Sequence, residues 1–261
     1  MTGAGRILIL APHPDDEIVA CGIAALRAQA AGARLHVLYL TTGVPPRELL
    51  WRRHQADYAR RIRRRRDEAV AAAALIGIEP AGFLDWPGRQ LRHHLDEAAE
   101  AVVRAVALHR ADALWVTAFE GGHQDHDAAN ALAARFRRQL AVSEFAAYNL
   151  AGGRVGANRF ADVCGGEIAI AATPEEAAFK AQALRTYGSE RLNLSHIGAS
   201  REMYRPLPRH DYFWPPHRGR LFRERFHWVP FRHPRIDFVP SAEIYPPLAR
   251  WVSAAEAADA A

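Results

Sequence analysis

Residues 11–17 read Ala-Pro-His-Pro-Asp-Asp-Glu and follow the apolar run Ile-Leu-Ile-Leu at residues 7–10. A short β-branched and leucine run that ends near a proline indicates a buried strand, and residues 18–31 before Gly32 indicate a helix. The polar stretch therefore lies on a strand-to-helix turn, which in an open α/β sheet faces the ligand-binding edge. Helix-dipole interactions explain acids at a helix start, but they do not explain His13 between two prolines.

Strands and helices alternate through the first half of the chain. Further strands are expected at residues 34–42, 81–86 and 112–119, and helices at 47–76, 91–109 and 128–140. This alternation predicts an α/β fold with a Rossmann-like, mostly parallel sheet and helices on both faces. Later strands are expected at 145–150 and 167–172. A helix is expected to follow Thr173, a capping residue, and to run to about Tyr187.

The second part of the chain is less regular. Residues 203–238 are dense in Arg, Pro, His and aromatic residues. Such a stretch is too apolar for a disordered tail, so we expect it to pack on the sheet edge, wall a pocket or support subunit contacts. We divide the chain into a Rossmann-like core, residues 1–195, and an irregular C-terminal extension, residues 196–261, packed on the same domain. Residues 254–261 are expected to be frayed.

Composition excludes several classes of protein. With 261 residues and 49% hydrophobic content, the chain can bury a sizeable core. No apolar run approaches the roughly 18 to 20 residues that span a bilayer, and no secretory apolar segment precedes His13, so we expect a cytoplasmic protein without a membrane span. Cys21 and Cys164 are the only cysteines, which supports neither a disulfide framework nor a thiolate zinc site.

Basic residues are concentrated in residues 60–66, Arg-Arg-Ile-Arg-Arg-Arg-Arg, and the net charge is +5. This run has no interleaved aromatic residues and no recognised nucleic-acid motif. A solvated helix face beside Asp67 and Glu68 is the better interpretation. We therefore expect no nucleic-acid partner, and the charge indicates only that an anionic substrate would not be repelled.

A second polar stretch repeats the arrangement of the first. Residues 120–127, Glu-Gly-Gly-His-Gln-Asp-His-Asp, follow the expected strand at 112–119 and precede a helix. If both strands are parallel members of one sheet, both stretches open on the same edge. Helix capping alone would not explain them, because capping asks for one small polar side chain and no imidazole. The sequence therefore predicts that the two turns converge.

The residue types of the two turns favour a catalytic zinc site. Two neutral imidazoles and one carboxylate are a typical zinc set that leaves a position open for water or substrate, and His13, Asp16 and His126 are the candidates. Asp15, on the same turn, is free to act as general base. His123 is placed to donate to an oxyanion or to protonate a leaving amine.

Asp125 completes the predicted site. It is suited to orient one of the two imidazoles without binding the metal itself. The histidines of the C-terminal region are irregularly spaced among prolines, which favours structural or solvated roles over a second metal site.

Residues 13–17, His-Pro-Asp-Asp-Glu, together with residues 123–126, His-Gln-Asp-His, resemble the PIG-L/LmbE-like family of metal-dependent N-deacetylases. The resemblance runs from about Arg6 to Asn193. It implies zinc at His13, Asp16 and His126, with ferrous iron left open as the alternative metal. It also implies Asp15 as the base and His123 as a group that stabilises the transition state.

The resemblance implies two substrate-binding residues as well. Arg65 and Glu68 match the Arg-x-x-Glu pattern of the family, which implies that Arg65 contacts the substrate. Asp85 falls near the place where relatives bind sugar hydroxyls. The chain departs from some relatives at Gly121 and Gln124, where they carry tyrosine and proline.

These observations predict a zinc-dependent hydrolase that removes an N-acetyl or similar acyl group from an amino sugar or glycoconjugate. The expected partner is a small N-acylated molecule, and a homo-oligomer is left open. One alternative is a zinc amidase that acts on a larger acyl or thiol conjugate. A second alternative is a nucleotide-binding module, but no Gly-x-Gly-x-x-Gly follows the first strand. A third is a non-catalytic metal-binding relative, but the complete set of acid and base residues argues against it.

Overall fold

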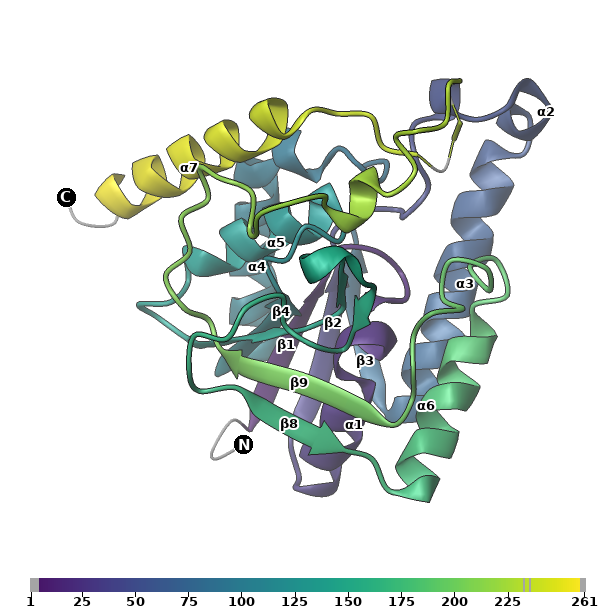
Figure 1. Ribbon diagram of the computed structural model, residues 1–261. Helices are drawn as coiled ribbons and strands as arrows, with labels where there is room; N and C mark the ends of the chain where they lie inside the picture. The colour runs from purple at the N-terminus through teal and green to yellow at the C-terminus, as the bar shows by residue number, and fades with distance from the viewer. Residues whose placement is uncertain (1–4, 232, 235, 259–261) are drawn as a thin grey trace.

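The computed structural model describes residues 5–231, 233–234 and 236–258. Within these residues the central sheet has the strand order β3-β2-β1-β4-β5-β9-β8 (Figure 1). Its strands are β1 (Arg6–Ala11), β2 (Arg34–Tyr39), β3 (Ile78–Phe83), β4 (Ala113–Thr117), β5 (Ala141–Phe145), β8 (Ile168–Ala171) and β9 (Arg201–Pro206). The five strands from β3 to β5 are parallel, whereas β9 and β8 continue the sheet in antiparallel pairing. The predicted α/β class with a mostly parallel sheet is confirmed.

Helices cover both faces of the sheet (Figure 1). One face carries α1 (Asp16–Ala30), α3 (Tyr58–Ile76) and α6 (Pro174–Thr186), and the other carries α4 (Leu95–His109), α5 (Gln124–Ala134) and α7 (Ser241–Ala258). Successive side chains of β1 alternate between the two cores, with Ile7 and Ile9 in one and Leu8 and Leu10 in the other. This period of two is the geometry of a strand buried on both faces. Each of these side chains contributes roughly 1.5–3 kcal/mol by its burial.

The basic segment does not form the single helix predicted over residues 47–76. It is divided into a 3₁₀ turn (Arg47–Leu49), α2 (Arg52–Gln55) and α3. Leu50 and Trp51 adopt extended backbone angles. The Gln55 side chain donates to the Leu50 carbonyl oxygen at 3.0 Å, and Arg47 Nε donates to the Gln55 carbonyl oxygen at 3.0 Å. Side chains thus satisfy backbone groups at the break, and helical periodicity alone could not reveal that.

Other boundaries also differ from the prediction. Strand β3 begins three residues earlier than expected, directly after Gly77, which ends α3 with a φ of 74°. Pro80 lies inside β3, which is tolerated because β3 is an edge strand. The strand expected at 145–150 is instead β5, which ends at Phe145, followed by the two-residue β6 (Tyr148–Asn149), which pairs with β7 (Gly156–Ala157). The predicted start of α6 is confirmed, since Thr173 and Glu176 form a reciprocal capping box.

The C-terminal region is more regular than expected. β9 lies between β5 and the edge strand β8 in the main sheet, and α7 packs against α5. The prediction of a frayed end at residues 254–261 is wrong for residues 254–258, because helix α7 continues to Ala258. Residues 259–261 lie outside the described residues. The division at residue 195 stays a prediction. None of the helices in the described ranges combines the length and the apolar character that a bilayer crossing requires.

Helix α1 is interrupted in its middle, where Cys21 has non-helical angles of −137° and 22°. Backbone N–H groups after the break donate to the Glu202 carboxylate of β9, that of Ile23 at 2.7 Å and that of Ala24 at 2.9 Å. Before the break, the Val19 carbonyl oxygen accepts from Lys180 Nζ at 3.0 Å, and Lys180 pairs with Glu202 at 2.7 Å. A buried ion pair therefore caps both halves of the interrupted helix.

Candidate metal centre

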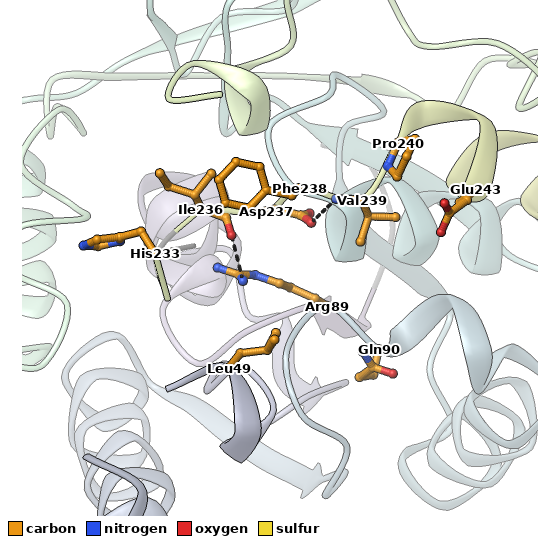
Figure 2. Close-up of a pocket in the computed structure, with 10 residues that line it drawn as sticks. All are labelled: Leu49, Arg89, Gln90, His233, Ile236, Asp237, Phe238, Val239, Pro240 and Glu243. Atoms are coloured by element: carbon orange, nitrogen blue, oxygen red, sulfur yellow. Dashed lines mark hydrogen bonds between the residues drawn. The ribbon is translucent and has the colours of Figure 1, made fainter. Parts of the chain in front are cut away.

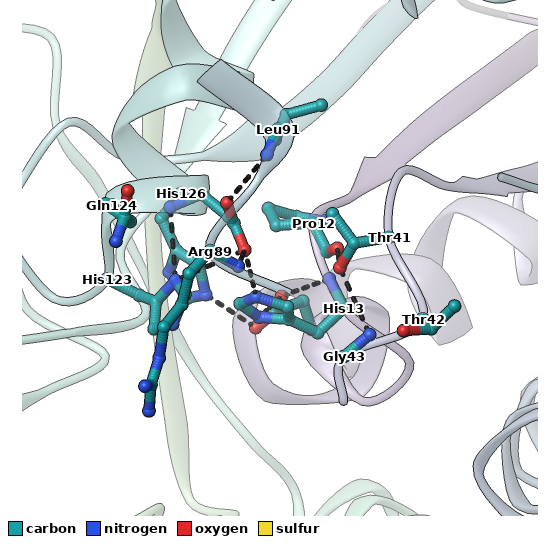
Figure 3. A network of polar contacts seen from close by, with 12 residues as sticks. Pro12, His13, Thr41, Thr42, Gly43, Arg89, Leu91, His123, Gln124 and His126 are labelled. Atoms are coloured by element: carbon teal, nitrogen blue, oxygen red, sulfur yellow. Dashed lines mark hydrogen bonds and ion pairs between the residues drawn. The ribbon is translucent and has the colours of Figure 1, made fainter. Parts of the chain in front are cut away.

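The two predicted polar turns leave neighbouring strands at the same edge of the sheet. β1 and β4 are parallel neighbours, with Leu10 opposite Val116. The turn after β1 leads into α1, and the turn after β4 leads into α5. Parallel strands place their carboxyl ends together, so the two turns face each other although more than a hundred residues separate them. The His13 and His126 side chains lie close together across this edge in Figure 3.

His13, Asp16 and His126 form a buried group that could hold a metal ion. One ligand atom from each residue lies within 4.8 Å of the others. The Asp16 carboxylate lies between the imidazoles, with Oδ2 3.1 Å from His13 Nδ1 and Oδ1 3.1 Å from His126 Nε2. Both ring nitrogens of His126 are buried and make no hydrogen bond among the described residues, because the 3.1 Å contact between Nε2 and Asp16 lacks hydrogen-bond geometry. A cation would satisfy such a nitrogen, so these residues fit a metal ion.

The electrostatics of the group also favour positive charge. Burial opposes ionisation of Asp16, but His126 and His13 outweigh it and hold the pKa of this carboxyl well below its usual range. Burial alone would lower the pKa of His13, yet its hydrogen bonds to Asp125 and Asp16 raise it to about 10. Two buried carboxylates thus attract a cation at the position of the imidazoles.

Asp125 holds His13 in place. Its Oδ2 lies 3.0 Å from His13 Nε2 and accepts from the Arg89 backbone N–H, while Oδ1 accepts from the Leu91 N–H at 3.2 Å. Burial opposes the charge, but the bond to His13 and the neighbouring positive groups lower the pKa of Asp125 to about 2. The contact leaves His13 Nδ1 facing Asp16, an arrangement suited to the orienting role predicted for Asp125.

His123 is the N-cap of α5, so the predicted start of this helix at residue 128 is wrong. Its Nδ1 accepts from the Asp125 backbone N–H at 3.1 Å. An imidazole therefore caps this helix, a role that we expected only of a small polar side chain. Because Nδ1 accepts, the proton of the neutral ring lies on Nε2. Burial and the nearby His13 lower the pKa of His123, and the two rings meet edge to face at 4.4 Å between centroids.

Asp15 has a backbone conformation that side chains rarely adopt, with a φ of 135°. Its N–H donates to Glu17 Oε2 at 3.1 Å, and its carbonyl oxygen accepts from the Ile18 and Val19 N–H groups in the first turn of α1. Such strain costs about 1–3 kcal/mol and is concentrated at functional sites. Burial raises the pKa of the Asp15 carboxyl, and the Arg65 guanidinium opposes that rise.

Arg65 lies beneath the first turn and is buried. Its Nη2 donates to the Pro14 carbonyl oxygen at 2.7 Å and to Asp15 Oδ2 at 2.9 Å. Its Nη1 donates to the Gly43 carbonyl oxygen at 2.7 Å and lies 3.3 Å from Glu190 Oε1. The guanidinium therefore supports the turn that carries Asp15, and its substrate contact stays a prediction.

Asp85 is not brought into the cluster. Its side chain is 83% exposed and is paired with Arg66 on α3. The sugar-binding role implied by the family resemblance stays a prediction for this residue. Eight site residues were predicted. The six from the two polar turns lie together with Arg65, whereas Asp85 lies outside this group.

An aromatic group beside His126 was not predicted. The Tyr148 ring on β6 lies 5.2 Å from the His126 ring, 4.7 Å from Phe222 and 5.3 Å from His196, measured between centroids. Arg225 lies over Phe222, with its guanidinium carbon 3.7 Å from the ring centroid. Burial and the nearby Asp16 and Asp15 carboxylates raise the pKa of Tyr148. No local pattern marks these residues, because three distant segments bring them together.

A cavity of about 390 Å³ lies next to this region (Figure 2). Arg89 connects the two, because its backbone N–H donates to Asp125 while its guanidinium donates to the carbonyl oxygens of Pro234 and Ile236 at 2.8 and 3.2 Å. Apolar side chains and two acids complete the wall of the cavity: Leu49, Ile236, Phe238, Val239, Pro240, Asp237 and Glu243. The C-terminal segment therefore walls a pocket, one of the three roles expected for it.

Comparison with known proteins finds similarity to N-deacetylases. Residues 8–136 match the model of the PIG-L family, described as GlcNAc-PI de-N-acetylase. A 2'-N-acetylparomamine deacetylase from Streptomyces fradiae is 34% identical over 141 residues, which cover 47% of this chain and 48% of that protein. The match thus spans about half the length of this curated relative.

Two solved structures share the fold. The zinc-inhibited form of teicoplanin deacetylase Orf2 is 20% identical, with a TM-score of 0.57 over 77% of this chain and 97% of that chain. The A40926 pseudoaglycone deacetylase Dbv21 is also 20% identical, with a TM-score of 0.58 over 77% of this chain and 96% of that chain. Residues 8–136 contain both His/Asp turns and match the PIG-L family model, so this segment of the chain is similar to that family.

Proposed function

We propose that this protein is a metal-dependent N-deacetylase that removes an acetyl or similar acyl group from an amino sugar or glycoconjugate. The observation that carries the proposal is the buried group of His13, Asp16 and His126 with the Asp15 carboxylate on the same turn. The name of the Streptomyces fradiae relative, 2'-N-acetylparomamine deacetylase, and the family description, GlcNAc-PI de-N-acetylase, support an amino-sugar substrate. A cytoplasmic location stays a prediction.

His13, Asp16 and His126 would hold the metal, and we propose Zn²⁺, since two imidazoles and one carboxylate are a typical zinc set. A bound Zn²⁺ supplies Lewis acidity, which lowers the pKa of water from about 15.7 to about 7. Asp125 keeps the His13 ring oriented through its 3.0 Å contact. Ferrous iron is the alternative, and reconstitution with each metal separates the two.

Asp15 takes a proton from the attacking water as the water oxygen bonds to the acyl carbon. The carbonyl oxygen gains negative charge, and His123 donates a hydrogen bond to it through Nε2. When the C–N bond breaks, the amine nitrogen receives the proton that left the water. The remaining proton of the water leaves the carboxylic acid for the amine, so the products are a carboxylate such as acetate and the protonated amine, and one water is consumed for each amide cleaved.

The test uses the full chain loaded with Zn²⁺ and N-acetylglucosamine as substrate, with acetate release as the readout. We expect Asp15→Asn to keep the metal and to lose most turnover, whereas His126→Ala loses both. His54→Ala, on α2, is the matched histidine control and keeps both. Failure of the wild-type chain to bind Zn²⁺ or Fe²⁺ stoichiometrically would refute the proposal.

A second measurement separates this function from the amidase alternative. Rates are compared on N-acetyl, N-butyryl and bulky N-aroyl derivatives of glucosamine. We expect the acetyl compound to react fastest. A clear preference for the bulky amides would replace the deacetylase with an amidase of larger conjugates.

A further inference from the structure

The Tyr148 hydroxyl is a hydrogen-bond donor for which the described residues supply no acceptor. The ring lies 5.2 Å from the His126 ring, and the one hydrogen bond found between Tyr148 and a side chain of the described residues is that of its backbone N–H. The side chain is only partly covered, so the hydroxyl is open to a bound molecule. A tyrosine with its ring packed and its hydroxyl unpaired is suited to meet a polar ligand atom.

The backbone of Tyr148 is tied to the second polar turn. Glu120 Oε1 accepts from the Ala147 N–H at 2.7 Å and from the Tyr148 N–H at 2.9 Å. Glu120 follows β4 and stands three residues before His123. The position of Tyr148 is therefore set by the same turn that presents His123 and His126.

Gly122 lets the second polar turn lie directly against Tyr148. A Cβ at this position would lie 2.4 Å from the Tyr148 carbonyl oxygen and 3.0 Å from ring atom Cε2. Only glycine allows this packing. Gly121 has a φ of 68°, and a Cβ there would lie 2.7 Å from Leu221 Cδ2, so the tyrosine that some relatives carry at that position would be strained and would displace the Leu221 side chain.

We propose that Tyr148 is a catalytic residue, whose hydroxyl donates a hydrogen bond to the acyl carbonyl oxygen as this oxygen gains negative charge. The inference rests on the proposed deacetylase function. Tyr148 and His123 both neighbour His126, at 5.2 and 5.7 Å between ring centroids, and so supply two donors beside the same metal-binding residue. Burial and the nearby carboxylates raise the pKa of Tyr148 above that of a free phenol, so its hydroxyl is protonated at neutral pH, and the step transfers no proton. The competing interpretation is that Tyr148 only packs against Phe222 and His196.

Tyr148→Phe separates the two interpretations, because it removes the hydroxyl and keeps the ring. Tyr58→Phe, on α3, is the matched control. Kinetics are measured with N-acetylglucosamine on Zn²⁺-loaded protein. Loss of one oxyanion donor lowers kcat by about 10²–10³-fold, and we expect such a loss with KM nearly unchanged. The thermal midpoint and the zinc content of the variant should equal those of the wild type.

Binding gives a readout independent of turnover. The probe is the methylphosphonamidate analogue of N-acetylglucosamine, whose tetrahedral centre carries a charged oxygen, with glucosamine as the product control; calorimetry measures both. We expect Tyr148→Phe to weaken the analogue by about the same factor as kcat/KM and to leave glucosamine binding unchanged.

Three results would overturn the inference. Wild-type rates and analogue affinity in Tyr148→Phe would reduce Tyr148 to a packing residue while the proposed function stands. Loss of zinc from this variant would place the effect in the metal group instead. Absence of acetate release by the wild-type chain would remove both this inference and the proposed function.

Discussion

Gly122→Ala is expected to damage the site by pushing Tyr148 away from the second polar turn. The added Cβ would lie 2.4 Å from the Tyr148 carbonyl oxygen, whereas ordinary van der Waals contacts begin at 3.4 Å. Both partners are backbone or fixed to it, because Glu120 holds the Tyr148 N–H. The two segments must therefore separate by about 1 Å, since no flexible side chain can give way.

The magnitude follows from that displacement. Overpacking of this kind costs about 1–3 kcal/mol in the free energy of unfolding. A displacement of about 1 Å in an active site costs about 10²-fold in rate. Each kcal/mol lowers the thermal midpoint of a chain of this size by about 2–4 °C.

Urea unfolding, the thermal midpoint and kcat/KM with N-acetylglucosamine are compared for Gly122→Ala and Gly198→Ala. A Cβ at Gly198 would have no atom within 4 Å, so this control should match the wild type. If Gly122→Ala retained both the stability and the rate of the wild type, the contact between Gly122 and Tyr148 would not constrain the site, and our reasoning about their spacing would be wrong.

Three further predictions concern the framework of the fold. Glu202→Gln leaves the Lys180 ammonium buried without its counter-ion, which should lower the free energy of unfolding by about 3–5 kcal/mol in urea titrations; a change below 1 kcal/mol would contradict this. Lys180 is the only lysine and is fully buried. Mass spectrometry should therefore find its side chain unmodified by an amine-reactive reagent in the folded chain and modified after denaturation. Equal labelling of Lys180 in both states would count against its burial. Thr173→Ala removes the hydroxyl that accepts from the Glu176 N–H at 3.2 Å and should cost about 1 kcal/mol by the same titrations, with no loss expected for Thr173→Ser.

Local sequence patterns predicted much of the fold. The alternation of apolar runs and helical segments gave the α/β class, and the first turn of α6 followed from Thr173 and Glu176, which cap each other across three residues. The two polar turns were visible because both His/Asp-rich stretches, residues 13–17 and 120–127, come after strand signals. In each case the residues that interact are neighbours in the chain or share a short period, so the pattern itself contains the information.

Elements were missed or misplaced where a side chain satisfies nearby backbone groups in an unexpected way, or where an element depends on distant partners. The basic segment breaks at Leu50 because side chains nearby satisfy its backbone, and α5 begins early because an imidazole, that of His123, caps it. Strand β9 exists through its pairing with β5 and β8, not through a strong pattern of its own.

The sequence by itself determined the fold class and the residues gathered at the carboxyl edge of β1 and β4. Only the tertiary structure decided that Arg65 supports Asp15, that Glu202 caps α1 from 179 residues away, and that Tyr148 stands beside His126. The physical reason is that propensity, periodicity and capping act over a few residues, whereas these contacts arise when the sheet and its helices pack and close long loops.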